Sequence, residues 1–290
     1  MISARRAQIF ALLAPYLMGA FLLVALPAGI SLYVSFTRYD GVSTPVWVGL
    51  QNFQLLRIEP LFWVALINSL IYISQAVLLR TLAALGLALL YNQPRRATGL
   101  YRAIAYLPTV IPDTAYALVW LWILNPLYGP LNLALRAFNL PAPAWLTDTR
   151  WAIPAIVLMS LFQVGEGLVI LLAGLRHIPR DLKDSARVDG ANALQTFSAI
   201  TLPLLSPWLI LLTVRDVVLS FQNTFTPAYI MTRGGPYYAT YFAPLLIYET
   251  AFDRLRFGQG AAIMLIVFAV TIFLVLALYF FFESWGFDDD

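Results

Sequence analysis

Six long apolar runs, separated by short polar segments, make up most of the chain. Each run has roughly 24 to 30 residues, enough for a helix to cross the bilayer's hydrocarbon core of about 30 Å. The pattern predicts an all-α, polytopic membrane protein that forms one domain over residues 1–290. Its six transmembrane helices are expected at 9–36, 62–91, 101–124, 151–175, 204–231 and 259–282.

The polar stretch 179–203, between the fourth and fifth spans, has a helical pattern of its own. Pro179 suits the start of a helix, with Asp181 as its cap and Asp184 stabilising its first turn. Gly190 permits a sharp break, because glycine adopts positive φ without strain.

A second short helix is expected from about Asn192 to Leu202, after which Pro203 and Pro207 turn the chain into the fifth span. The stretch could be a surface helix at the lipid interface. Its three acids and three bases near the turn argue against a basic, lipid-seeking helix.

Orientation follows from the basic residues of the short loops. Six spans place both termini on one side, and the compact turn 92–102 carries Arg95, Arg96 and Arg102. On the side of the termini, the N-terminus, the turn 92–102 and the stretch 176–203 together hold nine basic residues. The segments on the other side of the membrane hold seven. Both termini and 179–203 are therefore expected in the cytoplasm.

Composition supports the membrane prediction and excludes several kinds of site. The chain is 61% hydrophobic and 11% charged, with a mean hydropathy of +0.77, whereas globular domains are about 25% charged. It has no cysteine, which excludes disulfides and thiolate sites, and its single histidine, His177, argues against a histidine zinc site. We expect no metal site, and His177 is expected in a solvated loop. The net charge of +3 is spread over the loops, so no nucleic-acid partner is expected.

Lysine usage bears on ATP chemistry. Lys183 is the only lysine, and Asp184 follows it. A phosphate-binding loop of the type G-x-x-x-x-G-K-[ST] needs a lysine after glycine, so this chain cannot hydrolyse ATP that way. Any nucleotide energy must come from another subunit.

The stretch 179–203 also carries a long gapped motif. Asp184-Ser185-Ala186 is followed after three residues by Gly190, and after nine more by Ile200-Thr201-Leu202-Pro203. This resembles the pattern E-A-A, three residues, G, nine residues, I-x-L-P of permease subunits of binding-protein-dependent ABC importers. Asp184 and Ser185 depart mildly from that pattern. Other segments resemble the carbohydrate branch of these permeases, the maltose and glycerol-phosphate type. These segments are LPTVIP at 107–112, NPLYGPLN at 125–132, AGLRHIPRDL at 173–182 and GGP at 234–236. With them, the resemblance covers nearly the whole chain.

The resemblance implies a coupling helix over 181–195 that docks in a cleft of a cytoplasmic ATPase subunit. The coupling residues would be Asp184, Ser185, Ala186, Gly190, Leu202 and Pro203. It also implies a bacterial or archaeal cytoplasmic membrane and three kinds of protein partner. These are a second, related permease, two ATPase subunits that hold the ATP and Mg, and an extracytoplasmic solute-binding protein. No cofactor is expected in this chain itself.

Five ionisable residues fall at similar depth within the spans: Arg80, Asp113, Glu166, Arg215 and Asp216. Charges inside a membrane must pair or face water, and they often mark functional sites. Pairing between helices is predicted for all except Glu166, for example between Arg80 and either Asp216 or Asp113. Glu166 lies between Gly165 and Gly167, and in the resembled family this part of the fourth span contributes to the sugar site.

Sugar recognition needs planar acids or amides for the hydroxyl groups and aromatic faces for the C–H side of the ring. Two stretches supply these groups, one on the fourth span and one on the fifth. The predicted substrate-binding residues are Phe162, Gln163, Glu166, Ser220, Asn223 and Thr224. Trp120, Trp122 and Asn125 are weaker candidates, because tryptophans near an interface often serve as anchors.

The sequence thus predicts a non-enzymatic transporter subunit, which imports a sugar, oligosaccharide or polyol with ATP hydrolysed elsewhere. A self-contained ion-coupled transporter is the alternative, with Arg80, Asp113 and Asp216 as a relay. A membrane-embedded enzyme would need catalytic His, Asp or Glu clustered at one interface, and the sequence shows no such cluster.

Overall fold

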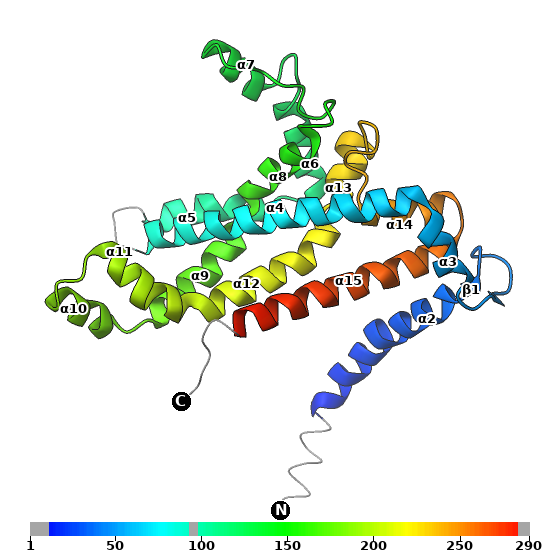
Figure 1. Ribbon diagram of the computed structural model, residues 1–290, viewed down its shortest axis with the longest axis horizontal. Helices are drawn as coiled ribbons and strands as arrows, with labels where there is room; N and C mark the ends of the chain where they lie inside the picture. The colour runs from blue at the N-terminus through cyan, green and yellow to red at the C-terminus, as the bar shows by residue number, and fades with distance from the viewer. Residues whose placement is uncertain (1–11, 93–97, 284–290) are drawn as a thin grey trace, which may run out of the picture. The chain divides into compact units, whose positions relative to one another are not determined.

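The computed structural model describes residues 12–92 and 98–283, which are mostly helical (Figure 1). The chain divides into two compact units. The first consists of Met1–Phe62 and Leu246–Ala269, and the second of Trp63–Leu245 and Val270–Asp290. Strands are confined, in the described ranges, to a short antiparallel hairpin of β1 (Thr37–Arg38) and β2 (Val46–Trp47).

Four helices in the described residues are long and apolar enough to cross a membrane, and two bent helix pairs bring the number to six if each pair is one span. The four are Leu12–Ser35, Pro60–Tyr91, Ala193–Thr232 and Phe257–Phe282. The predicted polytopic helical architecture is confirmed to that extent, and the count of six depends on the two bent pairs.

The third predicted span is broken near its middle. Thr98–Val110, formed by α5 (Thr98–Tyr106) and η2 (Leu107–Val110), meets α6 (Asp113–Ile123) at 100°. Ile111 is extended, with φ −72° and ψ 130°, because the ring of a following proline, here Pro112, disfavours the helical conformation. The span predicted over 101–124 therefore corresponds to this bent pair, if the pair is counted as one span.

The fourth predicted span is bent by 49° between Ala152–Gln163 and Gly165–His177. The first segment contains α8 (Ala152–Ser160) and η3 (Leu161–Gln163), and the second is α9 (Gly165–His177). A Cβ at Gly165 would lie 2.8 Å from Tyr106 Cα. The bend therefore sits where α9 starts against the backbone at the end of α5.

The fifth span begins earlier than predicted. Helix continues from Ala193 to Thr232 through Pro203 and Pro207, so the predicted second short helix and the fifth span form one helical stretch. Its parts are α11 (Ala193–Thr196), η4 (Phe197–Thr201), α12 (Leu202–Asn223), α13 (Phe225–Pro227) and η5 (Ala228–Thr232).

Local hydrogen bonds explain why those prolines are tolerated. The π-helical turn η4 shifts the hydrogen-bond register just before Pro203, which lies at the start of α12. Pro207 has no N–H to donate to Pro203 O, but the Ser206 hydroxyl donates to that oxygen at 2.7 Å. The helix therefore passes both prolines without leaving this carbonyl unpaired.

The first unit joins the end of the N-terminal span to the start of the last one. It contains η1 (Phe21–Ala25), α2 (Leu26–Ser35), the hairpin, α3 (Gln51–Ile58), η6 (Glu249–Asp253) and the first part of α15 (Phe257–Glu283). Asn52 is buried and donates from Nδ2 to Ser35 O at 2.8 Å and to Thr37 O at 2.9 Å. These bonds fix the end of α2 and β1 to α3.

Two apolar clusters hold the second unit together. One joins α4 (Pro60–Tyr91), α9 and α12 through buried side chains that include Ala84, Leu171 and Leu212. The other joins α6, α8 and η5, and there the Tyr116 hydroxyl donates to Met159 O at 2.8 Å. The unit also contains α7 (Pro130–Ala137), α10 (Arg180–Val188) and the start of α14 (Ala243–Tyr248). In Figure 1, α10 lies at the left of this unit and α7 at its top, well apart from each other.

Candidate functional site

Four charged side chains from three helices meet inside the second unit. Arg80 Nε on α4 lies 3.2 Å from Asp216 Oδ2 on α12, and Arg215 Nη1 lies 3.6 Å from Asp216 Oδ1. Arg215 Nη2 also pairs with Glu166 Oε2 on α9. We call Arg80, Glu166, Arg215 and Asp216 the charged cluster. It carries two positive and two negative charges, so its members neutralise one another within the spans.

The two halves of the charged cluster differ in exposure. The side chains of Arg80 and Asp216 are 8% and 12% exposed, whereas those of Arg215 and Glu166 are 33% and 46% exposed. The predicted pairing of Arg80 with Asp216 is confirmed. The inner pair ties α4 to α12, while the outer pair remains accessible from the surface of the unit.

Asp113 lies outside the charged cluster. It is the exposed first residue of α6, and no ion pair is recorded for it within the described ranges. The prediction that Asp113 pairs with another helix is therefore not supported, because the break before Pro112 places it at a helix start.

The predicted substrate residues of the fourth span surround the bend between α8 and α9. Phe162 is 53% exposed, and its ring lies 5.1 Å from that of Trp120. Gln163 is partly buried and lines a void of about 20 Å³ together with Arg80, Arg215 and Asp216. The structure thus brings Gln163 and Glu166 to the same cluster of charges.

The glycines on either side of Glu166 serve helix packing. Gly165 meets the end of α5, and a Cβ at Gly167 would lie 3.1 Å from Ala84 Cβ and 3.2 Å from a Leu212 methyl group. Both glycines allow another group to approach the backbone closely, as predicted, and the groups that do so belong to neighbouring helices.

On α12 the predicted residues differ in availability. The buried Ser220 hydroxyl accepts a hydrogen bond from Arg80, and the buried Thr224 hydroxyl donates to Phe221 O at 3.1 Å. Asn223 is exposed. Ser220 therefore belongs to the wall of the charged cluster, and Asn223 has the most accessible side chain of the three. Their roles as sugar ligands remain predictions.

The weaker candidates on the third span lie apart from one another. Trp120 is buried in the cluster formed by α6, α8 and η5, whereas Trp122 is 56% exposed. Asn125 Oδ1 accepts hydrogen bonds from Leu127 N at 2.9 Å and Tyr128 N at 3.2 Å. Asn125 therefore shapes the turn after α6.

The predicted coupling stretch is an exposed helix, turn and helix. Helix α10 begins after Pro179, which is its N-cap, and it has no buried residue. The prediction of Asp181 as cap was wrong, because Asp181 lies within the first turn and no side chain caps this end. Asp184 pairs with Arg187 at 3.4 Å, with side chains 65% and 75% exposed.

Gly190 completes a hydrogen-bonded end to α10. Its φ is +83°, Gly190 N donates to Arg187 O at 3.1 Å, and Ala191 N donates to Ala186 O at 2.9 Å. This pair of bonds is a Schellman motif, in which glycine is favoured at the left-handed position. The prediction of a sharp glycine break is confirmed.

The second helix of the stretch has a complete N-terminal cap. Asn192 Oδ1 accepts from Gln195 N at 2.9 Å, and Gln195 Oε1 accepts from Asn192 N at 2.8 Å. Leu202 and Pro203 of the motif follow in the first turn of α12. The exposed helix α10 is therefore connected by one fixed turn to the helix that carries Arg215, Asp216 and Asn223.

His177 lies just before the coupling stretch in the chain. It is exposed but is the last residue of α9, so its assignment to a loop was wrong. Its Nδ1 lies 2.8 Å from Ala173 O, and its ring lies 5.3 Å from that of Trp208. Trp208 was not predicted here, because the sequence gives no signal for it other than its aromatic character.

Comparison with known proteins gives one consistent result. Residues 81–285 match the family described as "Binding-protein-dependent transport system inner membrane component". The chain is 32% identical over 275 residues to the Bacillus subtilis protein described as "Probable ABC transporter permease protein YesP", covering 93% of this chain and 88% of that relative. It is 30% identical over 263 residues to the sulfoquinovosyl glycerol transport system permease protein SmoG of Agrobacterium fabrum, covering 90% of this chain and 85% of that relative.

Two solved structures share the fold. One is a bacterial ABC transporter involved in the import of the acidic polysaccharide alginate, with a TM-score of 0.83, 23% identity, and coverage of 97% of this chain and 96% of that chain. The other is the alginate transporter in complex with a periplasmic protein bound to an alginate pentasaccharide, with a TM-score of 0.81, 23% identity, and coverage of 95% and 93%.

Proposed function

Because the chain belongs to the inner membrane components of binding-protein-dependent transport systems, we propose that it is the transmembrane subunit of an ATP-driven sugar importer. The substrate would be a sugar, oligosaccharide or polyol delivered by an extracytoplasmic solute-binding protein. The relative named for sulfoquinovosyl glycerol and the fold shared with the alginate transporter support this substrate class. One permease domain with six spans would cross the cytoplasmic membrane, counting each bent pair as one span.

One observation carries the proposal. The gapped motif that begins at Asp184 lies on a fully exposed, charged helix, which ends in a Schellman turn at Gly190 and continues into α12. Such a helix has no interior partner for its charges, and the chain lacks the lysine-containing loop needed to bind ATP. A separate ATPase subunit bound to α10 accounts for both features.

The partners follow from this arrangement. Two ATPase subunits would bind the ATP and Mg, and a second, related permease would complete the pathway. Movement of α10 would be transmitted through the turn 189–192 to α12 and the charged cluster. The termini and α10 would lie in the cytoplasm, and α7, which lies well apart from α10 (Figure 1), would face the binding protein.

The sugar would bind beside the charged cluster. Gln163, Glu166 and Asn223 offer planar polar groups, and Phe162 offers an exposed ring. Ser220 and Thr224 would act with them, Ser220 through its contact with Arg80. Because Glu166 is already paired with Arg215, a bound sugar would compete with or join this pair.

ATP-dependent uptake in proteoliposomes containing the whole complex and its binding protein tests the proposal. A thermal-shift screen of the binding protein against a sugar panel first supplies the substrate. Glu166→Gln and Asn223→Ala are expected to lower uptake, while the exposed control Gln54→Ala retains it. Wild-type uptake by both variants would move the sugar site elsewhere.

The ion-coupled alternative predicts a different outcome in the same vesicles. It requires uptake by this chain without ATPase subunits, driven by an ion gradient through Arg80 and Asp216. The direct pairing of these two residues at 3.2 Å gives them a structural role that needs no proton transfer. Uptake without an ATPase would refute the importer.

A further inference from the structure

The first unit contains a cavity that the importer function leaves unused. It has a volume of about 280 Å³ and lies where β1 meets the first turn of α15. Gly258 makes this meeting possible, because a Cβ there would lie only 2.0 Å from Thr37 O. Together with the bonds from the buried Asn52 to Ser35 O and Thr37 O, the contact fixes the walls of the cavity.

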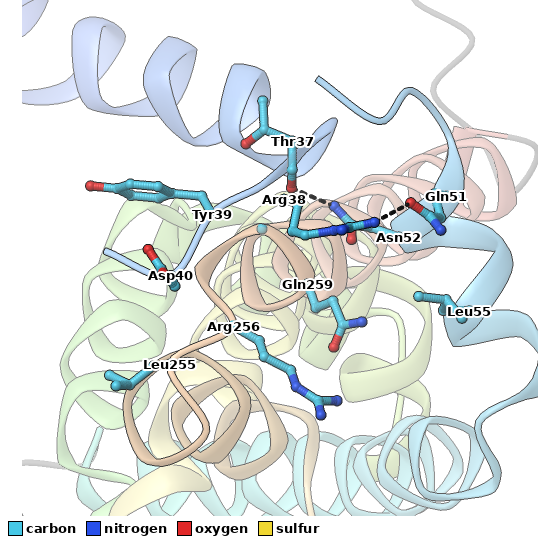
Figure 2. A pocket seen from close by; sticks show the side chains of 11 residues that line it. Thr37, Arg38, Tyr39, Asp40, Gln51, Asn52, Leu55, Leu255, Arg256 and Gln259 are labelled. Atoms are coloured by element: carbon cyan, nitrogen blue, oxygen red, sulfur yellow. Dashed lines mark hydrogen bonds between the residues drawn. The ribbon is translucent and has the colours of Figure 1, made fainter. Parts of the chain in front are cut away.

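Two arginines supply positive charge to this cavity. Arg38 Nη2 donates to Gln51 Oε1 at 3.4 Å, and Figure 2 shows the two side chains pointing toward each other. Arg256 is exposed, and its side chain has no recorded hydrogen bond or ion pair in the described part of the chain. In Figure 2 the side chains of Arg256 and Gln259 extend in the same direction. One guanidinium group is thus oriented by an amide, and the other is free to bind an anion.

Asp40 also lines the cavity, but hydrogen bonds already engage one of its oxygens. Its Oδ1 accepts from Ser43 Oγ at 2.7 Å, Ser43 N at 2.8 Å and Val42 N at 3.0 Å. These bonds, led by that from the Ser43 hydroxyl, lower the pKa of Asp40 to about 2. The lining therefore has two positive charges against one negative charge at neutral pH, and Asp40 Oδ2 can accept a further hydrogen bond.

A second cavity, of about 190 Å³, adjoins the first and has apolar side chains on its wall beside the charged Glu59 and Arg254. The two share Leu55, Arg256 and Gln259, and the second is also lined by Leu246 and Ile263. Ile263 is six residues beyond the start of α15, which corresponds to about 9 Å toward the middle of that span. The cavity at the end of a membrane span thus continues past apolar side chains along that span.

We propose that the two cavities together bind one anionic glycerophospholipid of the phosphatidylglycerol type. Its phosphodiester would lie between Arg38 and Arg256, because guanidinium groups donate paired hydrogen bonds to phosphate oxygens. A headgroup hydroxyl would donate to Asp40, and the start of an acyl chain would cover the exposed Leu55 and Ile58, which line the second cavity. Inorganic phosphate would satisfy the arginines but would leave these apolar side chains uncovered.

Native mass spectrometry of the full-length chain tests this lipid site. The protein is purified in detergent and incubated with equal amounts of phosphatidylglycerol and phosphatidylcholine, and retained lipids are counted. Wild type is expected to retain phosphatidylglycerol roughly tenfold more than phosphatidylcholine, as partly exposed charge pairs allow. Arg38→Gln with Arg256→Gln, and Arg256→Gln alone, are expected to lose most of this preference.

Controls separate the lipid site from general charge effects. Arg150→Gln removes an exposed arginine of the second unit and is expected to retain the preference of wild type. Millimolar glycerol phosphate is expected to displace little lipid, because it lacks the acyl chain. Equal retention of both lipids by wild type, an unchanged preference in the double variant, or complete displacement by glycerol phosphate would overturn the proposal.

Discussion

The charged cluster inside the second unit and the exposed helix α10 use the same kinds of side chain in opposite ways. In the charged cluster, Arg80 and Asp216 are almost buried and bind each other directly. On α10, which has no buried residue, Asp184 and Arg187 form a weak pair in contact with solvent. Both pairs join an arginine to an aspartate, but their environments differ.

The difference in exposure indicates different roles for the two sets of charges. Charges inside a span must be neutralised within the protein, because the membrane offers no water to solvate them. The paired charges on α10 are largely exposed to solvent, so the fold does not depend on them. Their arrangement therefore points to a partner, and the charged cluster points to the integrity of the pathway.

Breaking the inner pair should have the largest effect on stability. Asp216→Ala leaves the Arg80 guanidinium buried without its counter-ion, which costs about 3–5 kcal/mol. We expect a large fall in the melting temperature of the purified protein, measured by tryptophan fluorescence, and a low yield of folded protein.

The matched control replaces both partners. Arg80→Met with Asp216→Leu removes both charges and should recover most of the lost stability, because no buried charge is left unpaired. If the double variant melts as low as Asp216→Ala, the pair is not the source of the stability.

A substitution at Gly190 should have an intermediate effect, and on coupling more than on folding. Gly190→Val places a β-branched residue at φ +83°, which costs roughly 1–2 kcal/mol locally and distorts the end of α10. Gly190→Asn is the control, because asparagine tolerates the left-handed region. We expect uptake to fall strongly in the valine variant and to stay near wild type in the asparagine variant. Equal uptake by both would show that the turn is not needed.

Breaking the outer pair should affect stability less than breaking the inner one. Glu166→Gln removes a partner of Arg215, but both side chains are partly exposed, so the loss should be at most about 1 kcal/mol. The melting temperature in detergent should change by a few degrees at most. A loss as large as that of Asp216→Ala would mean that the two pairs act as one buried unit.

The smallest change in stability is expected for Asp184→Ala. The pair with Arg187 is largely exposed to solvent and should contribute less than about 0.5 kcal/mol. ATPase stimulation by the loaded binding protein should nevertheless fall in the assembled complex. Asp181→Ala, which removes another exposed acid of α10, is the control and should have a weaker effect. Equal ATPase activity in both variants and wild type would argue against docking through Asp184.

The regular features of the fold could be predicted because they depend on local sequence. The apolar runs located the spans, and Gly190 located the turn, since only its own φ is involved. Depth within the spans predicted that Arg80 pairs with Asp216 or Asp113 but did not choose between them, and the structure pairs Arg80 with Asp216.

The features that were missed depend on contacts between distant segments or on compensating hydrogen bonds. The bend at Val164 needs the end of α5 beside Gly165, which no local pattern reveals. The break before Pro112 was available from the rule for residues that precede proline. Pro207, by contrast, causes no break because Ser206 supplies the missing donor. The cavity between Arg38 and Arg256 joins segments from opposite ends of the sequence, so its two arginines counted only as loop charges.

Site-specific cross-linking measures most directly whether α10 docks on an ATPase subunit. The chain has no cysteine, so Ser185→Cys on the exposed face of α10 gives a single, nearly isosteric attachment point for a photoreactive maleimide. Phe138→Cys, at a side chain 77% exposed beside α7, is the control. In the assembled complex, position 185 should cross-link to the ATPase subunit and position 138 should not. A cross-link to the ATPase from position 138, or none from position 185, would contradict the account.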